Sequence, residues 1–289
     1  PEEGVPGCIA NGIDEKTANK IYDEMTDFAK YAFNKSHAAA YAVVSYQTAW
    51  LKYYYPVEYM AALMTSVIDN PGKVAEYIYS CRQMGIKILP PDINHGYSSF
   101  SVDNGSIRYG LAAIKSIGRP VIKEIVAERK ANGEFKNLKD FIERMSGKDI
   151  NKRTIENFIK SGAFDELGGT RKQFMVIYVQ ILDQLNREKK NSMTGQMSLF
   201  DIVGEEQKSE FDIPLPNVGE YEKSTKLAFE KEVLGIYLSG HPMEEYEEQW
   251  RKGISKTTQD FQFDEELGFS RVSDGAAEII GGIIASKTI

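Results

Sequence analysis

Apolar residues recur three and four positions apart along most of this chain, which is the spacing of amphipathic helices. Asp14 and Ser36 are suited to cap two of these helices, and Pro56 divides one long helical run into two. The pattern predicts helices at residues 14–29, 37–54, 56–66, 73–84, 171–190 and 220–238, with two more between residues 135 and 164. The fold is therefore predicted to be mainly α.

Strand patterns are short and few. Residues 86–89 form one apolar run, and residues 100–109 form two alternating runs joined through Asn104 and Gly105, a pair typical of tight β-hairpins. The last twelve residues, EIIGGIIASKTI, form a further strand-like run. A small β-hairpin and a strand at the C-terminus are therefore expected beside the helices.

Residues 107–129, IRYGLAAIKSIGRPVIKEIVAER, predict a short helix, a tight turn and a second helix. We expect Gly118 to take a positive φ in the turn, and Pro120 suits the first turn of the following helix. That helix would bury an apolar face made by Val121, Ile122, Ile125 and Val126. The pattern resembles a helix-hairpin-helix module, although a plain helical hairpin in a core explains these residues equally well.

A turn of this kind points unpaired backbone N–H groups and the positive end of a helix dipole outward, which favours an anion such as a DNA phosphate. The charge distribution supports this interpretation. Residues 106–172 contain 15 Lys and Arg against 9 Asp and Glu, a local +6, whereas the whole chain carries −7 and the remainder therefore −13. The predicted contacts with duplex DNA are Lys115, Ser116, Ile117, Gly118, Arg119 and Lys123.

Composition narrows the class of protein. The chain has 289 residues, enough for two or three domains, with 42% hydrophobic and 27% charged residues, as in a globular protein. Cys8 and Cys81 lack partners at metal-ligand spacing, and no apolar run reaches transmembrane length, so we expect a cytoplasmic protein with no membrane partner. A first residue other than Met and an apolar last run suggest a piece of a longer protein.

Several stretches, in order, resemble the bacterial C-family replicative DNA polymerases, the family of the DNA polymerase III alpha subunits. The resemblance covers nearly all of the chain. Its motifs are YAFNKSHAAAYAVVSYQTAWLKYYYPVEYMAALM, ILPPDIN, IRYGLAAIKSIG, NKRTIENFIKSGAFD, QMSLF, EKEVLGIYLSGHP and EIIGGIIASKTI. In this chain Ser116 stands where the family's hairpin often has glycine, so a tighter or shifted first turn is expected.

The resemblance implies a division of the chain. It assigns residues 1–90 to the C-terminal part of a fingers domain and 91–190 to a tandem helix-hairpin-helix domain. Residues 191–218 would be a linker, 219–274 a helical connector and 275–289 the start of an OB-fold. A degenerate second hairpin is expected near Gly162, unless Gly162 is an ordinary helix C-cap.

The resemblance also implies a nucleotide site and a clamp-binding motif. Lys35 and His37, in a loop at a helix N-terminus, would face an incoming deoxynucleotide, with Tyr41 and Gln47 on the following helix; alternatively, His37 caps that helix and Lys35 is solvated. Tyr53–Tyr55 are expected to pack in the fingers core. The stretch Gln196, Met197, Ser198, Leu199 and Phe200 would bind a sliding clamp, or anchor the linker to its own domain.

No catalytic or metal-binding residue is nominated in this chain. In the family, palm-domain aspartates N-terminal to this region hold the Mg²⁺ ions, and no acidic cluster here matches them. The segment alone is therefore predicted to be inactive. Two other functions stay open: a helix-hairpin-helix DNA-repair enzyme, for which Lys123 and Asp140 could serve, and a non-catalytic DNA-and-clamp adaptor. His95 and His241 are interpreted as structural.

Overall fold

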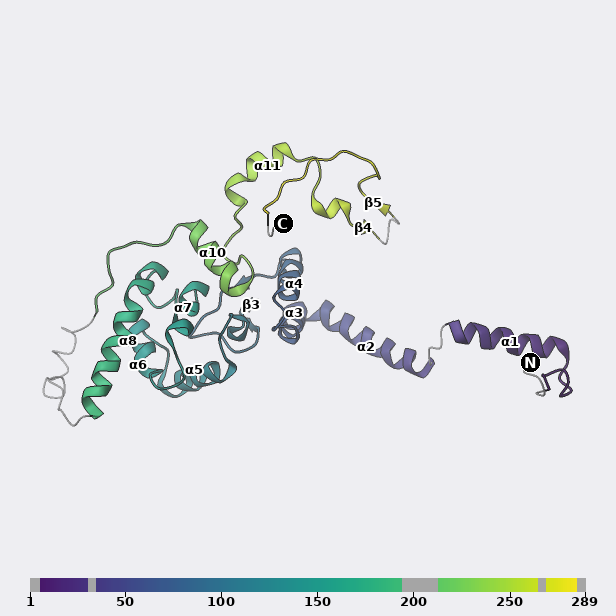
Figure 1. The fold of residues 1–289 in the computed structure, drawn as a ribbon, viewed down its shortest axis with the longest axis horizontal. Coiled ribbons are helices and arrows are strands. Elements are labelled where there is room, and N and C mark those ends of the chain that lie inside the picture. Colours follow the sequence, from purple (N-terminus) through teal and green to yellow (C-terminus); the bar gives the residue numbers. More distant parts are fainter. Residues whose placement is uncertain (1–5, 31–34, 194–212, 265–268, 285–289) are drawn as a thin grey trace. The chain divides into compact units, whose positions relative to one another are not determined.

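The computed structural model describes residues 6–30, 35–193, 213–264 and 269–284, and it is mainly α, as predicted (Figure 1). Contacts divide the chain into two units, Pro1–Tyr59 and Met60–Ile289. The division falls within α3 (Pro56–Ser66), so most of α3 packs with the residues that follow it. Among the described helices, none is both long and apolar enough to cross a membrane.

The first unit contains α1 (Glu15–Lys30) and α2 (Lys35–Tyr54). Asp14 caps α1 as predicted, because its carboxylate accepts from the backbone N–H of Thr17 at 3.0 Å and from the Thr17 hydroxyl at 2.6 Å. The prediction that Ser36 caps α2 is wrong, since the helix already begins at Lys35 and Ser36 lies in its first turn. The N-cap is the residue that precedes the first helical residue, and Ser36 is already helical.

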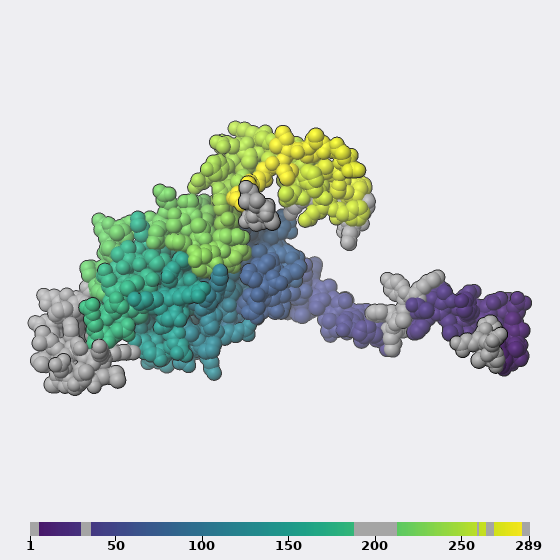
Figure 2. All heavy atoms as spheres, viewed as in Figure 1, coloured from purple at the N-terminus to yellow at the C-terminus, as the bar shows by residue number. Residues whose placement is uncertain are grey.

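The side chains of α2 are exposed from Ser36 onward, as the space-filling view shows (Figure 2). The aromatic run Tyr53–Tyr55, expected in a core, is exposed by 78%, 59% and 50%. Apolar side chains lie all round α2, whereas a helix on the surface of a globular protein usually has one apolar stripe. Within this unit, the described residues do not cover that surface.

In the second unit, α3 and α4 (Pro71–Gln83) are followed by a three-stranded sheet. Asn70 caps α4, and Gly85 follows it with φ +72°, so this helix ends close to the predicted residue 84. Strands β2 (Ser101–Asp103) and β3 (Ser106–Arg108) form the predicted hairpin. Its two turn residues, Asn104 and Gly105, have φ +48° and +75°, which a tight hairpin turn requires. Strand β1 (Ile88–Leu89) pairs with β3 in parallel.

After the sheet, a group of helices packs around an aromatic core. They are η1 (Leu111–Ala113), α5 (Arg119–Asn132), α6 (Leu138–Arg144), α7 (Lys152–Ser161), α8 (Arg171–Met193) and α10 (Lys223–Leu234). Phe141 lies at the centre of the core, with ring centroids 5.0 Å from Phe135, 6.2 Å from Phe158 and 4.9 Å from Phe164. These edge-to-face contacts pack α6 against α7.

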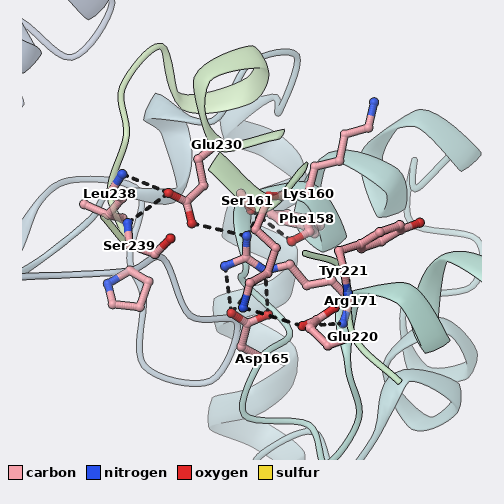
Figure 3. A network of polar contacts seen from close by, with 12 residues as sticks. Phe158, Lys160, Ser161, Asp165, Arg171, Glu220, Tyr221, Glu230, Leu238 and Ser239 are labelled. Carbon is pink, nitrogen blue, oxygen red and sulfur yellow. Dashed lines mark hydrogen bonds and ion pairs between the residues drawn. The ribbon is translucent and has the colours of Figure 1, made fainter. Parts of the chain in front are cut away.

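Arg171 ties three distant segments together (Figure 3). Its side chain is only 4% exposed and makes ion pairs with Asp165 at 2.8 Å and with Glu230 of α10 at 3.3 Å. Burial alone would lower the pKa of Arg171, but the hydrogen bonds and charge of Asp165, followed by Glu230, raise it above its ordinary value. Glu230 also accepts from the backbone N–H groups of Leu238 and Ser239, both at 2.9 Å. The segment 230–239 is thereby fixed against the turn between α7 and α8.

Gly162 ends α7 in the left-handed conformation, with φ +82°, as the C-cap interpretation predicted. A side chain at this position would strike the Arg171 guanidinium, so the glycine also makes room for the buried ion pairs.

The C-terminal residues form short elements: η4 (Glu244–Tyr246), α11 (Glu247–Gly253), η5 (Thr258–Phe261), β4 (Phe263–Asp264) and β5 (Phe269–Ser270). The expected first strand of an OB-fold is not formed over residues 278–284. The Ile279 carbonyl accepts from the N–H groups of Ser255 and Lys256, at 2.9 and 3.4 Å, but contacts to a single residue do not make a ladder. Apolar alternation gives a strand only where a neighbouring strand supplies hydrogen bonds.

Glu128 of α5 should make the stability of this unit pH-dependent. Hydrogen bonds, first from Lys148 and then from Asn132, hold the pKa of Glu128 at about 2, below its ordinary 4.5. Its contribution to the free energy of unfolding is therefore present above pH 4.5 and lost as the pH falls towards about 2. We expect Glu128→Gln to lower stability at pH 6 but not at pH 2, in urea unfolding at several pH values. Glu124→Gln, on the exposed face of the same helix, is the control, and equal curves for both variants would contradict the assignment.

Candidate nucleic-acid interface

The turn between η1 and α5, residues 114–118, is called the hairpin below. The expected positive φ of Gly118 is wrong: Gly118 has φ −75° and ψ 141°, and Ser116 has φ +64° instead. Gly118 is the N-cap of α5, and an N-cap takes an extended conformation that any residue can adopt. The chain therefore reverses two residues earlier, at the position where a glycine was noted as usual.

Helix α5 begins with an open N-terminus. Its N-cap residue is Gly118, and no side chain in the described part of the protein caps the helix. Pro120 lies in the first turn, as predicted. Ile117, Val121 and Ile122 are buried beneath it, whereas Ser116 and Gly118 are exposed. Uncapped N–H groups and the helix dipole therefore face solvent, an arrangement that favours an anion.

Two distant elements hold the hairpin in place. The N–H of Lys115 donates to the Val233 carbonyl of α10 at 2.8 Å, and the Lys115 carbonyl accepts from the Asn157 side chain of α7 at 2.7 Å. The hydroxyl of Tyr109 donates to the Leu234 carbonyl at 3.2 Å. The end of α10 is therefore part of the hairpin's support.

The positive charge near the hairpin is smaller than the sequence count suggests. Several cations of residues 106–172 are neutralised by carboxylates within the protein: Arg108, Arg144, Lys148, Lys152, Lys160 and Arg171. Lys115 and Lys123 are exposed and have no acidic partner among the described residues. Arg119 pairs with Asp69 at 3.3 Å, with both side chains exposed, and such surface pairs are weak. Three predicted cations thus remain at the hairpin, one of them loosely paired.

The second helical pair, α7 and α8, has its N-terminal anion position filled by the protein. The carboxylate of Glu220 accepts from the backbone N–H groups of Arg171 and Lys172, at 3.4 and 3.3 Å, and Figure 3 shows Glu220 at this helix end. Thr170 and Gln173 form a reciprocal capping box beside it. The helix end at which a degenerate second hairpin was expected is therefore closed by a carboxylate, whereas the N-terminus of α5 is open.

The four predicted nucleotide-binding residues all belong to α2. Lys35 begins the helix, and the rings of His37 and Tyr41, one turn apart, lie 4.3 Å from each other. Gln47 is six residues after Tyr41, which turns it about 120° round the helix. The structure therefore brings His37 and Tyr41 together and places Gln47 on another face, so the shared role of these residues stays a prediction.

The predicted clamp-binding residues, Gln196 to Phe200, lie outside the described residues. Asp140, considered for a repair enzyme, accepts from the Lys136 N–H at 2.9 Å and pairs with Arg144 at 3.2 Å. It is thus engaged in hydrogen bonds and an ion pair of the α6 region. No group of three His, Cys, Asp or Glu side chains suited to a metal occurs in the described parts of the chain.

Comparison with known proteins finds relatives that cover most of this chain. Residues 85–174 match the model of the helix-hairpin-helix motif. The alpha subunit of DNA polymerase III from Vibrio cholerae is 42% identical over 250 residues, which is 86% of this chain and 22% of the relative. This chain is homologous to part of DNA polymerase III subunit alpha.

Two further DNA polymerase III alpha subunits agree with this assignment. The subunit from Escherichia coli K12 is 43% identical over 241 residues, and that from Borreliella burgdorferi is 40% identical over 240 residues. Both matches cover 83% of this chain and 21% of the relative, so the chain spans about a fifth of the length of these alpha subunits.

Sequence reasoning missed two residues of this interface, Asn157 and Glu220. Neither belongs to a recognisable motif, because each acts on a backbone group more than forty residues away in the chain. The only local signal was that Asn157 interrupts the apolar side of α7.

Exchanging the glycine and serine of the hairpin tests where the backbone strain lies. Ser116→Gly should raise the free energy of unfolding by up to about 1 kcal/mol, because glycine adopts the left-handed conformation without a Cβ clash. Gly118→Ala should change it by less than about 0.5 kcal/mol, since a Cβ there meets only Pro120 Cδ at 3.6 Å. Urea unfolding measures both. Strong destabilisation by Gly118→Ala would show that the turn had been placed at the wrong residue.

Proposed function

We propose that this chain is the part of a replicative DNA polymerase that holds duplex DNA through its phosphate backbone. The observation that carries the proposal is the open N-terminus of α5, flanked by Lys115 and Lys123, which have no acidic partner among the described residues. A phosphate oxygen there would accept from backbone N–H groups and lie near two or three cations. Such contacts read no bases, so binding should depend little on sequence.

The parent protein is proposed to be a DNA-directed DNA polymerase, because its homologues are named DNA polymerase III subunit alpha. By resemblance, its Mg²⁺ would be held by aspartates outside these 289 residues, and we expect the chain alone to extend no primer. Lys35, His37, Tyr41 and Gln47 would contribute to the site for the incoming deoxynucleotide. The pairing of the His37 and Tyr41 rings on α2 supports a shared role for those two. A cytoplasmic location stays a prediction.

A repair enzyme is a weaker alternative. Asp140 is engaged in hydrogen bonds within α6, and Lys123 lies on the exposed face of α5. A glycosylase needs a pocket that accepts a flipped base beside its catalytic group. A non-catalytic DNA-and-clamp adaptor is the other alternative. A segment of such an adaptor would behave like a segment of a polymerase, and the two parent proteins would differ only in their remaining domains.

Salt dependence tests the grip on the DNA backbone. If three to five phosphates are neutralised, log K should fall with log salt at a slope of roughly −3 to −4.5. Replacing Lys115, Arg119 and Lys123 together with Gln should flatten the slope by up to about 3. Lys87→Gln, an exposed lysine outside the hairpin, is the control, and fluorescence anisotropy with duplexes of several sequences provides the measurement.

Gly118→Asp tests the anion position itself in the same assay. Asp is a good N-cap, and a Cβ at this position meets only Pro120 Cδ at 3.6 Å, so the helix should fold as well or better. The new carboxylate would occupy the α5 N-terminus as Glu220 occupies that of α8. Binding should weaken by about tenfold or more and lose about one unit of slope. A variant that binds duplex DNA like the unaltered protein would rule out the hairpin as the contact.

We also propose that residues 196–200 bind a sliding clamp, with Gln196 hydrogen-bonding and Leu199 and Phe200 filling an apolar pocket. Changing both Leu199 and Phe200 to Ala should cost at least about 2 kcal/mol, since buried aromatic anchors dominate small interfaces. That is roughly a thirtyfold loss of clamp affinity, measurable by calorimetry. Duplex binding by the same variant should be unchanged. Unaltered clamp affinity would reduce the motif to an anchor of the linker.

A further inference from the structure

The peptide groups on either side of Lys115 are held by two elements distant in sequence. On one side, the Lys115 N–H donates to Val233 at the end of α10, at 2.8 Å. On the other, the Lys115 carbonyl accepts from the side-chain amide of Asn157, at 2.7 Å. Asn157 lies on α7 and is only 7% exposed, so its amide is fixed by the surrounding core.

Lys115, whose peptide groups are held in this way, directly precedes Ser116, the residue with a strained backbone. Ser116 follows Lys115 with φ +64°, a conformation that residues other than glycine resist. The Lys115 carbonyl belongs to the peptide group that joins Lys115 to Ser116. A hydrogen bond to that oxygen therefore restrains the rotation that would let Ser116 relax to a negative φ. Such a relaxation would redirect the backbone that leads to Ile117 and Gly118.

We propose that Asn157 is a positioning residue for DNA binding: it holds the Lys115–Ser116 peptide so that the hairpin keeps the conformation that accepts a phosphate. This inference rests on the proposed function of the hairpin. Asn157 itself touches no DNA, because its side chain is buried beneath the turn. Its effect is on the fraction of molecules whose hairpin is competent to bind, and the apparent affinity scales with that fraction.

A purely structural role is the competing explanation, since any buried amide that loses its partner destabilises a fold. The two explanations differ in how they depend on Ser116. If Asn157 positions the hairpin, its removal should matter less once residue 116 is a glycine, which takes the left-handed conformation unaided. If Asn157 only stabilises the fold, the nature of residue 116 is irrelevant.

The experiment is a double-mutant cycle of Asn157→Leu and Ser116→Gly in the full 289-residue chain. Leucine keeps the volume of the side chain and removes the donor. Thr154→Val is the matched control, since Thr154 is a buried polar residue of the same helix and its hydroxyl bonds locally, to Asn151 at 3.2 Å. Duplex affinity by anisotropy and stability by urea unfolding are measured for every variant.

We expect Asn157→Leu to weaken duplex binding about tenfold when residue 116 is Ser, as for a competent fraction reduced to a tenth, and less than about twofold when it is Gly. Its effect on stability should be no larger with Ser at position 116 than with Gly, because relaxation of Ser116 offsets part of the loss, so a general loss of stability would not explain the difference in binding. Thr154→Val should leave binding within about twofold in both.

Two outcomes would overturn the inference: Asn157→Leu binding like the unaltered protein, or a loss of binding of equal size in both backgrounds. Neither touches the proposed function, which fails separately if the unaltered chain does not bind duplex DNA.

Discussion

A buried guanidinium must be matched by carboxylates, and this requirement organises the second unit. Arg171 is surrounded by the α7–α8 turn and finds Asp165 nearby in sequence and Glu230 fifty-nine residues later. Removing Arg171 would leave the Glu230 carboxylate buried without a cation, which is far more destabilising than losing a surface ion pair. The network therefore specifies that α10 packs at this place and in this orientation. Glu230 extends the constraint to Leu238 and Ser239 by accepting from their backbone N–H groups.

The hairpin inherits its geometry from that packing. Once Glu230 is fixed, the last turn of α10 presents the carbonyls of Val233 and Leu234 to Lys115 and Tyr109. The C-terminal carbonyls of a helix need donors, and the hairpin supplies them. The same principle closes α8, whose free N–H groups are met by Glu220. The N-terminus of α5, by contrast, has no side-chain cap in the described residues, and that end is the proposed phosphate site.

Features set by neighbouring residues could be predicted from the sequence. Asn104 and Gly105 form the β-hairpin turn, Pro120 lies in the first turn of α5, and Gly162 ends α7, because each depends on the conformational preferences of one or two residues. Which of Ser116 and Gly118 takes the positive φ could not be read in the same way. The local preference pointed to glycine, but the contacts of Lys115 with α7 and α10 place the reversal at Ser116. Asn157, Glu220 and Glu230 likewise gain their roles from partners that only the folded chain brings near.

The distance in sequence between Arg171 and Glu230 determines when, during synthesis, the hairpin can reach its final conformation. The match to the helix-hairpin-helix motif ends at residue 174, yet the hydrogen bond from the Lys115 N–H cannot form until Val233 has been synthesised. A nascent chain that has emerged only to the end of α8 carries an arginine without its α10 carboxylate. Its hairpin also still lacks one of the two supports of the Lys115 peptide groups. The ability to grip DNA should therefore arise late, after residue 239 has left the ribosome, although every proposed phosphate contact was synthesised more than a hundred residues earlier.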